Sequence, residues 1–168
     1  VLDWDHYILN GSKTFVTNGQ KAGLVIVVAK TDTSAGSKGI SLFLVEADLP
    51  GFSKGKHLTK LGLKAQDTSE LFFQDVKAPK ENLLGEEGRG FIYLMQDLPQ
   101  ERLSIAVGAV ANAKAILEAT IDYTKERKAF GTTVASFQNT QFKLAELSAE
   151  VDCAEVYTDR CTELLLED

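Results

Sequence analysis

The stretch Gly85-Glu86-Glu87-Gly88-Arg89-Gly90 divides the 168-residue chain into two parts with different hydrophobic periods. Before it, short apolar runs are separated by turn residues, a pattern that is typical of strands. After it, apolar residues recur every three to four positions, which indicates helices. No strand leads into a Gly-x-Gly-x-x-Gly pattern here, so a dinucleotide-binding fingerprint is not supported. We therefore predict an α+β chain with a β domain over residues 1–84 and a helical domain over residues 85–168.

The β domain is expected to be a small antiparallel barrel or sandwich. Asn10-Gly11 lies between two short apolar segments and favours a type I′ hairpin turn. Residues 24–29 form a continuous apolar run, which is typical of a strand covered on both faces. Residues 40–45 and 70–76 favour further strands. Several short strands at this spacing suit a barrel or a sandwich.

The helical domain is expected to hold two long amphipathic helices. The first should end near Arg127, and its apolar face comprises Leu103, Ala106, Val110, Ala113, Leu117, Ile121 and Thr124. The second should begin near Ser136, with a stripe that comprises Leu144, Leu147, Val151, Ala154, Cys161 and Leu165. This helix meets no capping residue at Asp168 and the chain lacks an initial Met, so we expect both domains to be truncated and the bundle to be incomplete.

Pro99 and Glu101 stand out at the start of this domain. Proline lacks a backbone donor, so Pro99 should begin or kink a helix. Glu101 would then lie in a first turn, where the helix dipole stabilises a carboxylate. From the residues alone, that structural role is the better explanation of Glu101.

Composition and charge exclude several function classes. The 18 Lys and Arg against 24 Asp and Glu give a net charge of −6, which argues against nucleic acid as a partner. No uninterrupted apolar run reaches the ~18 residues that span a bilayer, so we expect no transmembrane segment. The two histidines are isolated and no Cys-x-x-Cys occurs, so no metal site is expected. Cys153 and Cys161 would lie ~12 Å apart along one helix, which is too far for a disulfide.

Several segments, taken in order, resemble the middle and C-terminal parts of the acyl-CoA dehydrogenase family. They extend over essentially the whole chain, which makes a chance match very improbable. The segments are LNGSKTFVTNG at residues 9–19, GISLFLVE at 39–46, LGLKAQDT at 61–68, VKAP at 76–79, ERKAFG at 126–131 and FQNTQ at 137–141. LGLKAQDT and the LPQERL segment at residues 98–103 are most similar to the long-chain type within the family.

The resemblance implies an FAD enzyme that oxidises acyl-CoA thioesters to trans-2-enoyl-CoA in fatty-acid β-oxidation. A carboxylate would take the α-proton while the β-hydrogen leaves as hydride to the flavin. In the long-chain type the base lies where this sequence has Glu101, whereas most members take it from a C-terminal segment absent here. The resemblance also implies a homotetramer, electron-transfer flavoprotein as acceptor, and a bacterial cytoplasmic or mitochondrial matrix location.

The same resemblance implies specific cofactor and substrate contacts. The cofactor residues are Phe15, Val16 and Thr17 at the flavin ring, Arg127 at the pyrophosphate of a neighbouring subunit, and Phe130 and Gln138 on the adenosine side. The substrate residues are Ser37 and Lys38 on the CoA loop, and Pro99, Gln100 and Arg102 beside the acyl-CoA pocket. For Lys38 a solvated surface lysine is an equally good explanation.

Three alternatives stay open at this point. A flavin oxidase similar to acyl-CoA oxidase would use the same scaffold with oxygen as acceptor. A non-catalytic relative would bind CoA or a partner protein without the chemistry. The chain could also serve simply as a folding or assembly unit. Since each site is only partly contained in these 168 residues, we expect the isolated chain to have no dehydrogenase activity.

Overall fold

The computed structural model describes residues 2–167, which form two compact units. The first unit is rich in β-strands and ends at Met95, and the second is helical and begins at Gln96. The expected α+β fold, with antiparallel sheets followed by two long helices, is confirmed. The expected domain boundary at residues 84/85 stays a prediction.

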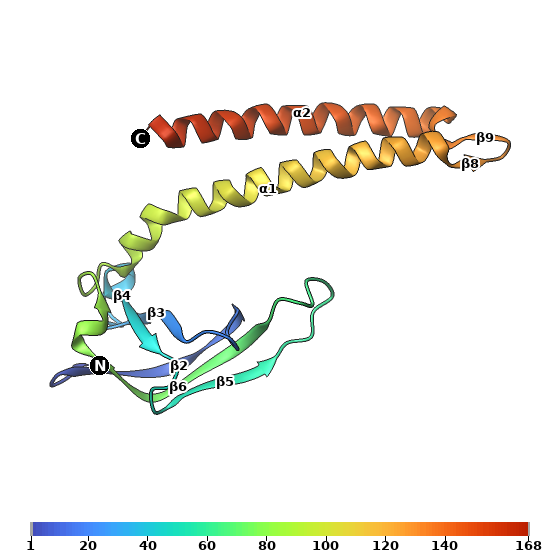
Figure 1. Ribbon diagram of the computed structural model, residues 1–168. Helices are drawn as coiled ribbons and strands as arrows, with labels where there is room; N and C mark the ends of the chain where they lie inside the picture. The colour runs from blue at the N-terminus through green and yellow to red at the C-terminus, as the bar shows by residue number, and fades with distance from the viewer. Residues whose placement is uncertain (1, 168) are drawn as a thin grey trace. The chain divides into compact units, whose positions relative to one another are not determined.

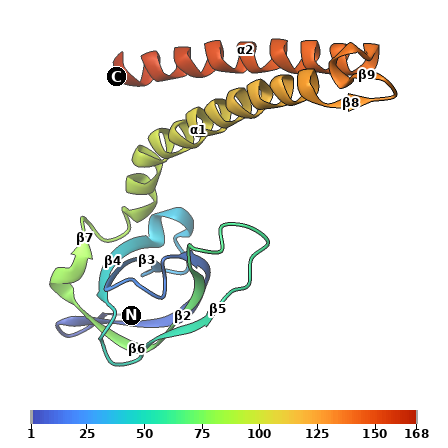
Figure 2. The same cartoon turned by 45° about the vertical axis from the view of Figure 1, so that its right-hand side comes forward.

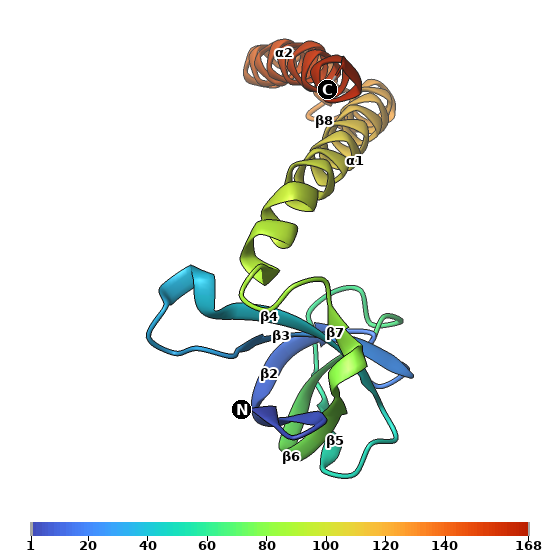
Figure 3. The same cartoon turned by 90° about the vertical axis from the view of Figure 1, so that its left-hand side faces the viewer.

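Two antiparallel sheets make up the β-rich unit (Figure 1). The first sheet contains, in spatial order, β1 (Leu2–Asp3), β2 (His6–Thr17), β6 (Thr68–Pro79) and β5 (Phe52–His57). The second contains β3 (Leu24–Lys30), β4 (Ile40–Glu46) and β7 (Leu83–Leu84). Figure 3 shows both sheets from another side.

The apolar core is formed by side chains of both sheets. Tyr7 packs against Phe43 across the sheets, with ring centroids 4.8 Å apart. Alternate residues of a strand face the same side, so the long strand β6 supplies several members of this core. The buried residues of the cluster are Tyr7, Leu9, Leu71, Phe73, Val76 and Ala78 from the first sheet, and Val27, Phe43 and Val45 from the second.

The prediction of a hairpin turn at Asn10-Gly11 is wrong, because β2 runs without interruption through both residues. The β2–β6 register shifts here, since Leu9 pairs with Val76 and Gly11 pairs with Phe73. Gly11 has φ 145°, so glycine serves a β-bulge rather than a turn. The first hairpin turn lies earlier, between β1 and β2, with Trp4 at φ 57°.

The strand at residues 24–29 is found as β3, but its cover on both faces is not. Leu24 and Ile26 are 55% and 57% exposed, whereas Val27 is buried in the core. β3 pairs with β4 at one edge, and its other edge has no strand partner among the described residues. The continuous apolar run therefore reflects a sheet face that the described residues leave open.

The helical unit contains a hairpin of two long helices, α1 (Gly90–Glu126, whose first turns belong to the β-rich unit) and α2 (Gln138–Glu167). Figures 1 and 2 show α2 running back beside α1. Lys114 Nζ of α1 donates to both carboxylate oxygens of Glu155 of α2, at 2.7 and 2.8 Å. Thr124 and Thr158 are buried. Between the helices lie β8 (Lys128–Ala129), β9 (Thr132–Thr133) and the 3-10 turn Val134–Ser136.

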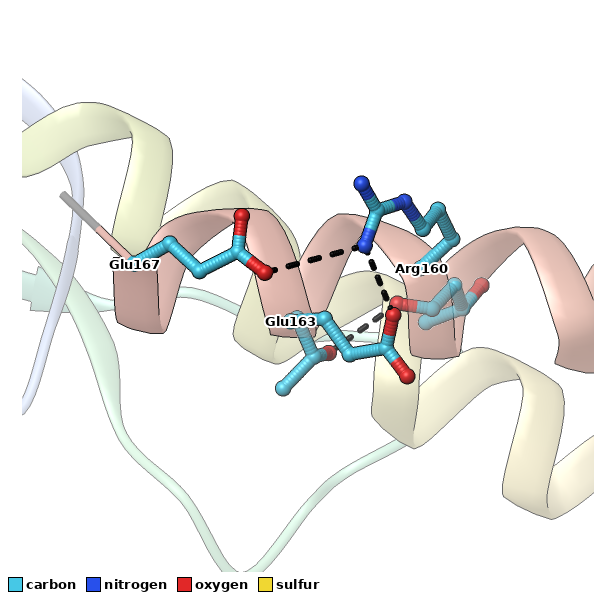
Figure 4. A network of polar contacts seen from close by, with 5 residues as sticks. Arg160, Glu163 and Glu167 are labelled. Carbon is cyan, nitrogen blue, oxygen red and sulfur yellow. Dashed lines mark hydrogen bonds and ion pairs between the residues drawn. The ribbon is translucent and has the colours of Figure 1, made fainter.

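The helix faces agree only partly with their predicted patterns. In α1 the less exposed side includes Leu103, Ala106, Val110, Leu117, Ile121 and Thr124, as expected, but Ala113 is exposed. In α2 Leu144, Val151 and Cys161 are partly buried, but Leu147, Ala154 and Leu165 are exposed. The exposed α2 surface also carries ion pairs, since Arg160 Nη1 lies 2.9 Å from Glu163 and 3.9 Å from Glu167 (Figure 4).

Pro99 does not begin α1, because the helix already starts at Gly90. Phe91, Ile92, Leu94 and Met95 extend the helical pattern on its N-terminal side, and one missing backbone donor interrupts a single hydrogen bond of a long helix. Glu101 therefore lies inside α1 and not in a first turn. The helix dipole consequently offers no explanation for this carboxylate.

One helix of the described chain meets a length and composition criterion for spanning a membrane. An 18-residue window of α1 has a mean hydropathy of 1.3. This window is not an uninterrupted apolar run, so the absence of such runs from the sequence still holds. A single candidate helix is weak evidence for a membrane span, because a core helix of a helical bundle satisfies the same criterion.

Candidate functional site

Phe15 lies in a second β-bulge, near the end of β2. Lys13 pairs with Leu71 and Val16 with Ser69, so β2 contains one residue more than β6 over this interval. Phe15 has φ 56° and its side chain is 77% exposed. A left-handed backbone costs a bulky residue about 1–2 kcal/mol, and the ring recovers little of this by packing. The strained backbone and exposed ring make Phe15 a candidate functional residue.

The neighbours of Phe15 face alternate sides of the strand. Val16 is partly buried and packs against the core cluster, whereas Thr17 is exposed and pairs with Thr68 at the end of the sheet. The sequence-predicted flavin residues are therefore contiguous at one sheet end. The ring of Phe15 and the hydroxyl of Thr17 are both exposed there and could contact a planar ligand.

Buried polar groups fix the turn that follows Thr17. Asn18 has φ 60°, and its N–H donates to the backbone carbonyl of Asp67 at 3.0 Å. The N–H of Gln20 donates to Asp67 Oδ2 at 2.7 Å. Lys54 Nζ donates to the carbonyl of Gln20 at 2.8 Å. Sequence reasoning gave Asp67 no role, because its segment LGLKAQDT does not show which groups this carboxylate binds.

Ser37 and Lys38 lie on the 3-10 turn Gly36–Gly39, between β3 and β4, and both are exposed. The backbone around them is ordered, since the N–H of Thr31 donates to the carbonyl of Gly39 at 2.9 Å. Gly39 leaves no space for a Cβ, which would collide with the carbonyl of Asp32. Hydrogen bonds from the Ser34 side chain and backbone lower the pKa of the Asp32 carboxyl. The loop presents a hydroxyl and an ammonium to solvent.

The loop that enters α1 is attached to the β-rich unit. Tyr7 Oη donates to Glu87 Oε2 at 2.9 Å, and the N–H of Gly88 donates to Ser41 Oγ at 2.8 Å. Burial, followed by the hydrogen bond to Glu87, raises the pKa of Tyr7. These contacts hold the start of the helix that carries Glu101 further along. The sequence offered no local signal for this long-range tyrosine–glutamate pair.

The predicted catalytic and acyl-side residues Pro99, Gln100, Glu101 and Arg102 occupy consecutive positions of α1, and all are exposed. Glu101 forms no ion pair or side-chain hydrogen bond with residues 2–167. Its carboxylate is therefore available to act on a ligand rather than being held by a neighbouring cation.

Arg127 precedes β8, Phe130 lies between β8 and β9, and Gln138 follows the 3-10 turn after β9. The N–H of Arg127 donates to the Tyr123 carbonyl at 2.9 Å, and its own carbonyl accepts the N–H of Val134 at 2.8 Å. Phe130 has φ 53°, is 98% exposed and lies edge-on to Phe137 at 6.4 Å. Gln138 begins α2 and is exposed.

Glu101 and the Arg127 group do not share one site within the helical unit. Arg127 lies 26 positions after Glu101, directly beyond the end of α1, which corresponds to about 39 Å of axial rise. Within one chain, Glu101 and Arg127 therefore cannot contact the same small group.

The side chains present fit the contacts that FAD requires. Phe15 and Phe130 are exposed aromatic rings on strained backbone, and rings of this kind stack on flat heterocycles. The Arg127 guanidinium has no ion-pair partner in the described part of the chain, and its planar fork matches a phosphate. Among the described residues there is no group of three or more His, Cys, Asp or Glu side chains that could hold a metal ion.

Comparisons with known proteins identify the family. The model of "Acyl-CoA dehydrogenase, middle domain" matches residues 2–76, and that of "Acyl-CoA dehydrogenase, C-terminal domain" matches residues 88–168. The chain is 55% identical over 164 residues to the mitochondrial long-chain specific acyl-CoA dehydrogenase of Sus scrofa. That alignment covers 96% of this chain but only 38% of the pig enzyme.

Solved structures agree with this result. The crystal structure of an acyl-CoA dehydrogenase from Geobacillus kaustophilus superposes with a TM-score of 0.91 at 51% identity, covering 96% of this chain and 43% of that one. An acyl-CoA dehydrogenase complexed with FAD from Bacillus anthracis gives a TM-score of 0.82 at 38% identity, covering 92% of this chain and 26% of that one. Together with the ordered motifs, these matches show that the chain belongs to the acyl-CoA dehydrogenase family.

Proposed function

We propose that this chain forms part of an FAD-dependent acyl-CoA dehydrogenase, which converts acyl-CoA thioesters to trans-2-enoyl-CoA. The observation that carries the proposal is the exposed Phe15 ring on a left-handed backbone, directly followed by Val16 and Thr17. The match to the long-chain enzyme of pig favours a fatty acyl-CoA as substrate. The chain spans 38% of that relative's length, so the activity is proposed for a longer protein.

Glu101 is the proposed catalytic base. The α C–H of a thioester is a weak acid, so the base has to be oriented and free of competing partners. Glu101 meets the second condition within the described chain, and α1 fixes its backbone. When bound, FAD supplies the acceptor for the hydride that leaves the β-carbon. Arg102, Gln100 and Pro99 are proposed to line the acyl-CoA pocket beside this base.

The remaining site residues are proposed to bind rather than to react. Thr17 donates a hydrogen bond toward the flavin ring, against which Phe15 and Val16 pack. Arg127 binds the cofactor pyrophosphate of a neighbouring subunit, with Phe130 and Gln138 on the adenosine side. Ser37 and Lys38 contact the CoA portion of the substrate.

Assembly and partners follow from the same proposal. Exposed apolar side chains on both helices, such as Ile105 (73%), Ile116 (65%) and Val156 (71%), suit contacts with further helices of a bundle. A homotetramer would bring Arg127 to a neighbouring cofactor. We propose electron-transfer flavoprotein as electron acceptor, with a mitochondrial matrix or bacterial cytoplasmic location.

The test is Glu101→Gln in the full-length protein, compared with Glu118→Gln, which changes another exposed glutamate of α1. Loss of the base should lower kcat at least ~100-fold, while FAD remains bound. Glu118→Gln should leave kcat unchanged. Near-normal turnover of Glu101→Gln would move the base to another segment. Hydrogen peroxide production with oxygen would instead favour the oxidase alternative, and a wild-type protein without flavin absorbance would favour a non-catalytic relative.

A further inference from the structure

Asp67 is a buried carboxylate to which the proposed function assigns no role. Its residue is only 6% exposed, and it lies immediately before β6. Burying a carboxylate is costly unless hydrogen bonds compensate for the lost water. The hydrogen bonds that Asp67 forms therefore indicate which part of the fold its burial serves.

Both the backbone and the side chain of Asp67 bind the turn that follows Thr17. The Asp67 carbonyl accepts the N–H of Asn18, and Oδ2 accepts the N–H of Gln20 at 2.7 Å. Hydrogen bonds to a charged acceptor are stronger than neutral ones. The turn is thus fixed at two points by one residue, which directly precedes the opposite strand β6.

The space beneath this turn is closely packed and polar. A Cβ on Gly19 would collide with Ser69 Oγ and would lie 3.2 Å from the carbonyl of Val16. Ser69 is fully buried. Asp67 Oδ1 and Ser69 Oγ have no hydrogen-bond partner among the described residues, so the Asp67 side chain gains little from this location except the bond to Gln20.

We infer that Asp67 is a positioning residue for the flavin-binding segment. Its carboxylate fixes the Asn18–Gln20 turn. This turn then holds Phe15 in its left-handed conformation and sets the direction of the Thr17 hydroxyl. This inference rests on the proposed contact between Phe15–Thr17 and FAD. Asp67 itself touches neither substrate nor cofactor in this account.

The experiment compares Asp67→Ala and Asp67→Asn in the full-length holoenzyme, with Asp75→Ala as matched control. Asp75 also lies on β6 and also binds β2, but at the Asn10 end of the strand pair, away from Phe15. Asp67→Ala should weaken FAD binding about tenfold and change the flavin absorbance spectrum. Asp67→Asn retains an acceptor for the Gln20 N–H and should restore most of both properties. Asp75→Ala should leave both unchanged.

Hydrogen exchange at the Gln20 amide separates this inference from the proposed function. Asp67→Ala should lose protection at Gln20, whereas Asp75→Ala should keep it. Equal protection at Gln20 in wild type and Asp67→Ala, or equal FAD affinity and spectra in all variants, would overturn the inference. If Asp67→Ala does not fold, Asp67→Asn provides the test. Loss of protection at Gln20 in Asp67→Asn together with unchanged FAD affinity and spectrum would also overturn the inference. A wild-type protein that binds no FAD, with the Gln20 result as expected, would refute the proposed function instead.

Discussion

The side chain of Asn10 forms two hydrogen bonds with Asp75, at the point where the backbone pairing of β2 and β6 is interrupted. Its Nδ2 donates to Asp75 Oδ1 and its Oδ1 accepts the N–H of Asp75, both at 2.9 Å. Asp75 has φ 52°, so the backbone of β6 is left-handed at this bulge. One amide side chain thus satisfies groups that the interrupted ladder would leave unpaired.

Removal of the Asn10 amide should destabilise the β-rich unit. Asn10→Ala loses two exposed hydrogen bonds, which should lower the free energy of unfolding by about 1 kcal/mol. Urea denaturation measures this change. Asn112→Ala is the control, because it removes an amide that binds only its own helix, at Gly108. A loss of stability in Asn112→Ala equal to that in Asn10→Ala would contradict the role of the bulge.

Replacement of Trp4 should stabilise the protein. Trp4 has φ 57° in the β1–β2 turn and is 94% exposed, so it carries backbone strain without packing in return. Asn tolerates the left-handed region, and Trp4→Asn should raise the free energy of unfolding by about 0.5–1 kcal/mol. Trp4→Val, with a β-branched side chain, should lower it. The midpoints of thermal unfolding of both variants measure these changes. A lower midpoint for Trp4→Asn than for wild type would show that backbone strain at Trp4 does not destabilise the fold.

Tyr7 should make stability depend on alkaline pH. Burial and the bond to Glu87 raise its pKa, so the folded protein holds the phenol proton more tightly than the unfolded chain does. This contribution is complete below the unfolded pKa, about 10, and is lost as the pH rises through the folded pKa. Tyr7→Phe should lose about 1 kcal/mol at pH 8, and its difference from wild type should shrink above pH 10.

Urea unfolding between pH 8 and pH 11 measures this convergence. Tyr123→Phe is the control, because Tyr123 is 62% exposed and its side chain forms no hydrogen bond within the described part of the chain. A difference between wild type and Tyr7→Phe that stays constant with pH would show that the Tyr7 proton is not linked to folding.

Arg127 should contribute to cofactor affinity in the assembled protein. Arg127→Gln removes a guanidinium that the described residues do not neutralise, and FAD binding should weaken at least about tenfold. Arg127→Lys should recover only part of this affinity, since an ammonium does not form the planar fork. Arg160→Gln, which breaks surface ion pairs of α2, should bind FAD as wild type does. Flavin titration measures these affinities, and equal FAD affinity of Arg127→Gln, Arg160→Gln and wild type would show that Arg127 is a solvated surface cation.

The periodic parts of the fold could be predicted from the sequence. The change of period after Gly90 marks α1, and the predicted end near Arg127 differs by one residue from the observed end at Glu126. Apolar periodicity is a collective signal over many residues, so it survives local irregularities such as Pro99. Pro99 does not end the helix, because it removes one backbone donor from a helix of 37 residues.

Local irregularities could not be predicted in this way. Gly11 serves a bulge although Asn-Gly is a strong turn signal, because glycine permits positive φ in both cases. The true turn contains Trp4, which no turn rule favours. The candidate site residues rest on family motifs, and no pattern within the chain distinguishes Glu101 from other helical glutamates. Asp67 was missed because its importance arises only when β6 is placed beside the end of β2.

Three aromatic residues, Trp4, Phe15 and Phe130, have left-handed backbones and nearly free side chains. A laboratory selection that rewards heat resistance alone would be expected to replace all three with asparagine or glycine. At Trp4 such a replacement carries no functional penalty in our account. At Phe15 and Phe130 it would raise the stability of the protein but weaken the proposed flavin contacts. Variants recovered from such a selection would therefore show, position by position, which residues serve only the fold and which serve binding.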